Sequence, residues 1–214
     1  MTNKVSPPPK FLIDRYKNWK SSEYLKNEVQ LKKLASSGQS PSTMVISCCD
    51  SRIHPTSIFE ADEGEFFIHR NIANLVPPYS LDGENHATSA AIEYAIMELK
   101  VTHLIILGHK DCGGIKYGHQ MHSDSLNTNY EFINKWLSIL LPAYNNIQKN
   151  VSEQEQKNRL EKESIKVSIN NLLSFPFLKK AIDDNKLSIH GLIHDIGSGS
   201  LKFLNPVTEE FEDL

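Results

Sequence analysis

The 214-residue sequence has few cysteines, no long apolar run and no excess of positive charge. No stretch approaches the ~20 consecutive apolar residues of a membrane span. The polar N-terminal segment, residues 1–10, lacks the apolar core of a signal peptide. A net charge of −3 argues against nucleic acid as the main partner, because phosphate binding requires a basic face. We therefore expect a cytoplasmic protein that binds neither membrane nor nucleic acid.

Apolar periodicity predicts strands that alternate with helices. Short apolar runs bounded by turn-forming residues predict strands at residues 43–47, 65–69, 103–107 and 187–193. Apolar residues at 3–4 spacing predict helices at residues 11–35, 86–99, 129–147 and 150–174. This alternation predicts an α/β fold with a central, mainly parallel β-sheet flanked by helices. We expect one domain over residues 1–214, with residues 1–36 as an N-terminal helical arm.

Two of the predicted strands end in residues that can bind a metal. Cys48 follows the first strand, and His109 and Cys112 follow the third. Functional sites of open α/β sheets lie outside the carboxyl ends of strands, so these residues can converge if the strands are neighbours. Two thiolates and one imidazole suit zinc, and three protein ligands leave the fourth position open, as in catalytic sites. Each residue alone also has an ordinary interpretation, as a core cysteine or a structural histidine.

Two charged residues, Asp50 and Arg52, follow the first candidate ligand closely. They alternate, so in an extended segment their side chains would leave the same face. A guanidinium can bind a carboxylate through two hydrogen bonds, which would keep Asp50 ionised and oriented. The alternative is a surface salt bridge worth under ~1 kcal/mol. Beside a candidate ligand we favour a catalytic role, because perturbed acids cluster at functional sites.

The third cysteine, Cys49, directly follows Cys48. On a strand its side chain would point to the opposite face, so we expect a buried thiol outside the metal site. A redox role for the two adjacent cysteines is a rival interpretation. Adjacent cysteines rarely close a relaxed disulfide, however, and the sequence has no Cys-x-x-Cys motif.

Several separate segments, in this order along the chain, resemble the plant-type branch of the β-class carbonic anhydrases. They cover most of the chain and lie at residues 38–41, 48–52, 69–79, 90–94 and 108–114. The resemblance implies reversible hydration of carbon dioxide to bicarbonate and a proton by zinc-bound hydroxide. By position, it implies one Zn²⁺ per chain on Cys48, His109 and Cys112, with Asp50 and Arg52 as the catalytic dyad.

The same resemblance implies a substrate pocket. Gln39 and the backbone N–H of Gly113 match groups that bind substrate or bicarbonate oxygens, and Phe67, Ile72 and Tyr94 match the apolar pocket wall. In this family the pocket crosses a dimer interface. Gln39, Phe67 and Tyr94 would therefore come from the partner subunit, which the N-terminal helices would reach. We expect a dimer or a higher even oligomer.

Some members of the family have an inactive state, and other members act on substrates other than carbon dioxide. In the former, the aspartate binds zinc at low pH, and a Trp and a Tyr line a second bicarbonate pocket. Val45 and His194 occupy those two places here, so we predict an open zinc site without that pocket. Other relatives hydrolyse carbon disulfide or carbonyl sulfide. An inactive bicarbonate- or zinc-binding protein is a further alternative, although no ligand or dyad residue is lost.

Overall fold

The computed structural model describes residues 5–82, 86–123, 125 and 130–214, and the chain divides into two compact units. Residues 1–4 of the predicted polar N-terminus lie outside the described part. The first unit, residues 1–39, contains α1 (Lys10–Ser21) and α2 (Glu23–Ser37). A single helix was predicted here, but the backbone at Ser22 leaves the helical region, with φ −125° and ψ −79°. Neither helix buries a residue, and large apolar side chains such as Phe11 and Trp19 are exposed.

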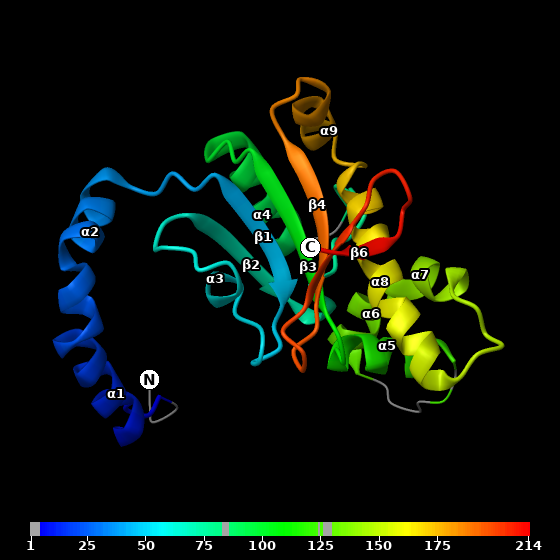
Figure 1. The fold of residues 1–214 in the computed structure, drawn as a ribbon, viewed down its shortest axis with the longest axis horizontal. Coiled ribbons are helices and arrows are strands. Elements are labelled where there is room, and N and C mark those ends of the chain that lie inside the picture. The colour runs from blue at the N-terminus through cyan, green and yellow to red at the C-terminus, as the bar shows by residue number, and fades with distance from the viewer. Residues whose placement is uncertain (1–4, 83–85, 124, 126–129) are drawn as a thin grey trace. The chain divides into compact units, whose positions relative to one another are not determined.

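The second unit, residues 40–214, is built on a sheet that has six strands within the described residues (Figure 1). The strands are β1 (Thr43–Cys48), β2 (Phe66–Asn71), β3 (His103–His109), β4 (Ser188–His194), β5 (Leu201–Leu204) and β6 (Phe211–Asp213). Their order is β2-β1-β3-β4-β5-β6, parallel from β2 to β4 and antiparallel from β4 to β6. The predicted mainly parallel sheet is confirmed, and β5 and β6 are an addition that was not predicted.

Helices precede and follow the strands of this unit. They are α3 (Pro55–Ile58), α4 (Ala87–Glu93), α5 (Gly113–His122), α6 (Glu131–Leu137), α7 (Leu141–Asn146), α8 (Glu153–Leu172) and α9 (Pro176–Asp183). A π-helical turn, Tyr94–Glu98, extends α4. The stretch predicted as one interrupted helix from residue 129, which lies outside the described residues, is α6, a 3₁₀ turn and α7. No helix among the described residues is long and apolar enough to cross a membrane.

The sheet separates two apolar layers. On one face Met44, Ile46, Leu104 and Ile106 pack with side chains of α4, α8 and α9. On the other face Val45, Leu107 and Leu192 pack with Ile53, just before α3. Every residue of β1 is buried, as expected for a central strand of a parallel sheet covered on both faces. A third cluster, formed by α5 to α8, surrounds Cys48 and Cys112 beyond the carboxyl ends of β1 and β3.

Two glycines allow α8 to lie close against the sheet. A Cβ on Gly108 would lie 2.8 Å from Cδ1 of Ile165, and a Cβ on Gly191 would lie 2.9 Å from Cγ2 of the same residue. Because protein interiors are close-packed, a larger side chain at either position would push the helix outward. The contact of Ile165 with these two glycines therefore fixes where the preceding turn of α8 lies relative to the carboxyl end of β3.

Candidate active site

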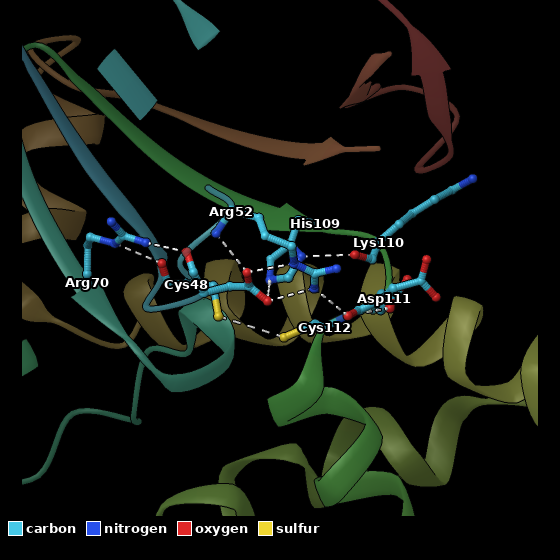
Figure 2. Close-up of polar contacts among 9 residues, drawn as sticks. Cys48, Arg52, Arg70, His109, Lys110, Asp111 and Cys112 are labelled. Carbon is cyan, nitrogen blue, oxygen red and sulfur yellow. Dashed lines mark hydrogen bonds and ion pairs between the residues drawn. The ribbon is translucent and has the colours of Figure 1, made fainter. Parts of the chain in front are cut away.

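The three predicted metal ligands come together at the carboxyl ends of two neighbouring strands. Cys48 ends β1 and His109 ends β3, and these strands pair in parallel with Ser47 opposite Leu107. Cys112 immediately precedes α5. Figure 2 shows the Cys48, His109 and Cys112 side chains converging. Their ligand atoms all lie within 4.8 Å of one another, and all three residues are buried.

The geometry of this cluster fits zinc. The Nδ1–H of His109 donates to the Lys110 carbonyl at 2.9 Å, which leaves Nε2 as the nitrogen available to a metal. That Nε2 is buried and has no hydrogen-bond partner among the described residues. The Cys48 and Cys112 sulfurs are 3.8 Å apart. Tetrahedral Zn²⁺ with Zn–S bonds near 2.3 Å requires a sulfur separation of about 3.8 Å.

The two sulfurs also perturb each other's ionisation. A hydrogen bond from the Cys112 thiol lowers the pKa of Cys48 to about 4, and the same contact raises the pKa of Cys112. Backbone N–H groups of Asp50 and Ala73 further lower the pKa of Cys48. Ala73 has a left-handed backbone, with φ 63°, in the 3₁₀ turn Ile72–Asn74. Cys48 is therefore surrounded by groups that favour the thiolate, which is the form that binds a metal.

Asp50 and Arg52 form the predicted bidentate pair. Asp50 Oδ1 accepts from Arg52 Nε at 2.9 Å, and Oδ2 accepts from Arg52 Nη2 at 2.8 Å. These hydrogen bonds hold the pKa of Asp50 well below its usual range. The pairing arises in a turn rather than in the extended segment that was predicted, because β1 ends at Cys48 and Oδ1 also accepts the Arg52 backbone N–H. Asp50 Oδ2 lies 3.9 Å from His109 Nε2, so the carboxylate borders the metal position.

Arg70 holds the loop that carries the first ligand. From β2, its Nε donates to the carbonyl of Cys48 at 2.9 Å and its Nη2 donates to the carbonyl of Asp50 at 2.7 Å (Figure 2). Sequence reasoning gave this residue no role of its own. Its partners are backbone carbonyls of a neighbouring strand end, and such contacts leave no spacing signal in the sequence.

Glu161 holds the loop that carries the other two ligands, and sequence reasoning missed it as well. It lies on α8, is 5% exposed, and its Oε1 accepts the backbone N–H of Cys112 at 3.1 Å. Burial raises the pKa of Glu161 to about 7. The sequence of α8 contains many charged residues. It therefore gives no signal that distinguishes the one buried glutamate from the solvent-exposed glutamates around it.

The residues of the predicted pocket fall into two groups. Gly113 is the first residue of α5, where an N–H has no acceptor within the helix, and it directly follows Cys112. Ile72 lies against the same helix, since a Cβ on Gly114 would come within 2.7 Å of its Cγ2. Phe67 and Tyr94 instead contact each other, with ring centroids 5.8 Å apart.

Phe67 and Tyr94 lie away from the ligands of their own chain. Phe67 is opposite Met44 in the sheet, four residues before Cys48, or about 13 Å along the strand. Gln39 is the last residue of the first unit. The structure therefore brings Ile72 and Gly113 to the metal ligands and leaves Phe67 and Tyr94 apart, which is compatible with their predicted contribution to a partner's pocket.

The prediction that the Cys49 thiol is buried was wrong. Cys49 is exposed, whereas a buried thiol was expected. The expectation treated residue 49 as part of a strand, but β1 ends at Cys48 and the chain turns directly afterwards. Partial burial and the neighbouring Cys48 raise the pKa of the Cys49 thiol. This thiol does not belong to the ligand cluster.

Comparisons with known proteins agree with this geometry. Residues 43–201 match the family model described as carbonic anhydrase. The chain is 41% identical to β carbonic anhydrase 3 of Arabidopsis thaliana over 187 aligned residues. This alignment covers 86% of this chain and 71% of the Arabidopsis protein. The solved β-carbonic anhydrase CcaA matches with a TM-score of 0.85 and 25% identity, over 96% of this chain and 91% of that one. A tetrameric β-carbonic anhydrase of Sordaria macrospora matches with a TM-score of 0.76 and 31% identity, over 91% and 95% of the two chains.

Proposed function

The chain belongs to the plant-type branch of the β-class carbonic anhydrases, and we propose that it hydrates carbon dioxide on one zinc ion held by Cys48, His109 and Cys112. The observation that carries the proposal is the buried cluster itself, with three ligand atoms within 4.8 Å. Zinc at such a site makes water a nucleophile near neutral pH. The products are bicarbonate and a proton.

Asp50 and Arg52 orient the reacting water in this proposal. Ionised Asp50 lies beside the metal position, where it would accept a hydrogen bond from the reacting water and orient that water toward the carbon of carbon dioxide. Arg52 binds both carboxylate oxygens, so it keeps Asp50 ionised and directs it away from the metal. Two thiolates cancel the formal charge of Zn²⁺, which makes the contribution of these neighbouring groups larger.

The substrate lies between apolar and polar groups. Ile72 supplies part of an apolar wall that suits an apolar gas, and the N–H of Gly113, at the first position of α5, would stabilise charge that grows on a substrate oxygen. Phe67 and Tyr94 cannot complete the wall from within the same chain. We assign them, with Gln39, to the pocket of a partner subunit in a dimer or higher even oligomer.

A subunit-mixing experiment tests this assignment. Cys48→Ser and Gln39→Ala chains, each nearly inactive alone, are expected to regain activity when they are co-expressed and purified as hybrids through two different tags. In a hybrid dimer one site carries both changes and the other carries neither. The expected activity is about half that of the parent, by this counting of intact sites. Hybrids as inactive as the separate variants would place Gln39 in the pocket of its own chain.

Carbon disulfide and carbonyl sulfide are rival substrates, because the same nucleophile can attack them. Stopped-flow hydration of carbon dioxide is compared with release of hydrogen sulfide from both compounds, on the same metal-quantified protein. We expect carbon dioxide turnover with little or no sulfide release. Rapid sulfide release without carbon dioxide hydration would replace the proposed substrate, and binding of bicarbonate without any turnover would replace the enzyme by a binding protein.

A further inference from the structure

Glu161 occupies an unfavourable position for a carboxylate. It is 5% exposed, and its Oε2 has no hydrogen-bond partner among the described residues. Burying a charged or polar group with incomplete hydrogen-bond partners is unfavourable. A leucine would fill this position without that cost. The partners that the carboxylate does have are therefore informative.

Those partners belong to the loop between His109 and Cys112. The backbone N–H of Cys112 donates to Oε1 at 3.1 Å, and the backbone N–H of Asp111 also lowers the pKa of the carboxyl group. Asp111 has φ 55°, a left-handed conformation that non-glycine residues rarely adopt. Consecutive N–H groups beside a left-handed residue form a concave anion-binding arrangement. Glu161 accepts the Cys112 N–H beside this left-handed residue and so stabilises the loop conformation.

The position of Glu161 is set by packing. Ile165, one turn further along α8, contacts Gly108 at the end of β3 and Gly191 on β4. This contact places the preceding turn of the helix, with Glu161, directly at the loop that follows β3. The carboxylate is thus fixed to the rigid part of the fold, and the loop is fixed to the carboxylate.

The loop conformation also reaches the dyad. The carbonyl of Asp111 accepts from Arg52 Nη2 at 3.1 Å, and the same Nη2 donates to Asp50. A peptide that shifted at Asp111 would therefore displace Arg52 as well as Cys112.

We infer that Glu161 is a positioning residue for the metal centre: through the Cys112 N–H it fixes the loop that holds Cys112 in its ligating position and Arg52 against Asp50. The inference rests on the proposed zinc site. The property of Glu161 that holds the loop is its hydrogen-bond acceptor, placed at the distance from the backbone that a glutamate side chain reaches. The negative charge and the volume of the side chain are not what holds it.

Three substitutions separate these possibilities. Glu161→Leu keeps volume and removes the acceptor, Glu161→Gln keeps an acceptor at the same reach, and Glu161→Asp keeps the charge but is one methylene too short. Glu163→Gln is the matched control, because Glu163 is on the same helix and pairs with Lys166 at 3.0 Å. Zinc affinity is measured on stripped protein by competition with a chromophoric chelator. The absorption spectrum of the cobalt-substituted protein reports the ligand geometry independently of activity.

We expect Glu161→Leu and Glu161→Asp to weaken zinc binding by about 10- to 100-fold and to change the cobalt spectrum. Glu161→Gln is expected to stay within about threefold of the parent, because it keeps the hydrogen bond to the loop, and Glu163→Gln should match the parent. Unchanged zinc affinity and cobalt spectrum in Glu161→Leu and Glu161→Asp would overturn the inference, even if their thermal stability fell. Strong binding by Glu161→Asp with weak binding by Glu161→Gln would also overturn it. Failure of the parent itself to bind zinc would instead contradict the proposed function.

Discussion

Replacing Cys48 with serine is expected to abolish both zinc binding and carbon dioxide hydration. Cys48 supplies one of only three candidate protein ligands in the described cluster, and its sulfur lies 3.8 Å from that of Cys112. A serine hydroxyl is a much poorer zinc ligand than a thiolate and does not ionise near neutral pH. Because enzymes accelerate reactions by ~10⁶-fold or more, we expect a loss of at least about 10³-fold in kcat/KM.

The adjacent cysteine provides the matched control. Cys49→Ser makes the same chemical change one residue later, at an exposed thiol outside the ligand cluster. It is expected to keep nearly all of its zinc and activity. The measurement is metal content by mass spectrometry together with stopped-flow hydration for both variants. Equal losses in the two variants would show that the cluster has been assigned to the wrong cysteine.

Replacing Asp50 with asparagine is expected to lower kcat/KM by about 10²-fold while zinc stays bound. In the unchanged protein the two oxygens of Asp50 accept hydrogen bonds from Arg52 Nε and Nη2 at 2.9 and 2.8 Å. Asparagine has nearly the same shape but offers Arg52 only one acceptor oxygen. Since Arg52 holds the pKa of Asp50 well below its usual range, the group is ionised from pH 7 to pH 8.5. The loss should therefore be the same at both values.

Two further variants delimit the role of this pair. Arg52→Lys keeps the positive charge but loses the two-pronged contact, so we expect a loss close to that of Asp50→Asn. Asp184→Asn removes an exposed carboxylate that pairs with Lys186 at 3.1 Å, and activity should not change. If Asp50→Asn retained full activity, or lost its zinc, Asp50 would be a structural residue or a ligand rather than a group that orients the reacting water.

The sequence alone predicted the parallel core of the sheet, and it predicted that the three ligands would meet if the two strands that carry them were neighbours. Buried parallel strands have continuous apolar runs, and the carboxyl ends of neighbouring strands share one edge, so Cys48 and His109 had to lie close together once β1 paired with β3. The catalytic and substrate-binding roles of the other residues remain predictions, although the structure places Asp50, Arg52, Ile72 and Gly113 around the cluster.

The features that the sequence did not predict depend on contacts that leave no repeating pattern of apolar residues in the sequence. β5 and β6 span four and three residues, too short for an alternating pattern to stand out, and charged residues such as Lys202 and Glu212 interrupt them. The burial of Cys49 was predicted wrongly because the end of a strand is uncertain by a residue or two. Arg70 and Glu161 act on backbone groups of distant segments, so only the fold reveals them.

Carbon dioxide hydration by this chain is expected to depend on zinc bound by Cys48, His109 and Cys112. The most direct measurement is the stopped-flow hydration rate of chelator-stripped protein as zinc is added back in known amounts. We expect no activity without zinc, a linear rise in the hydration rate as zinc is added, and a plateau at one zinc per chain. Full zinc occupancy with no hydration above buffer, or undiminished hydration after complete removal of the metal, would contradict this expectation.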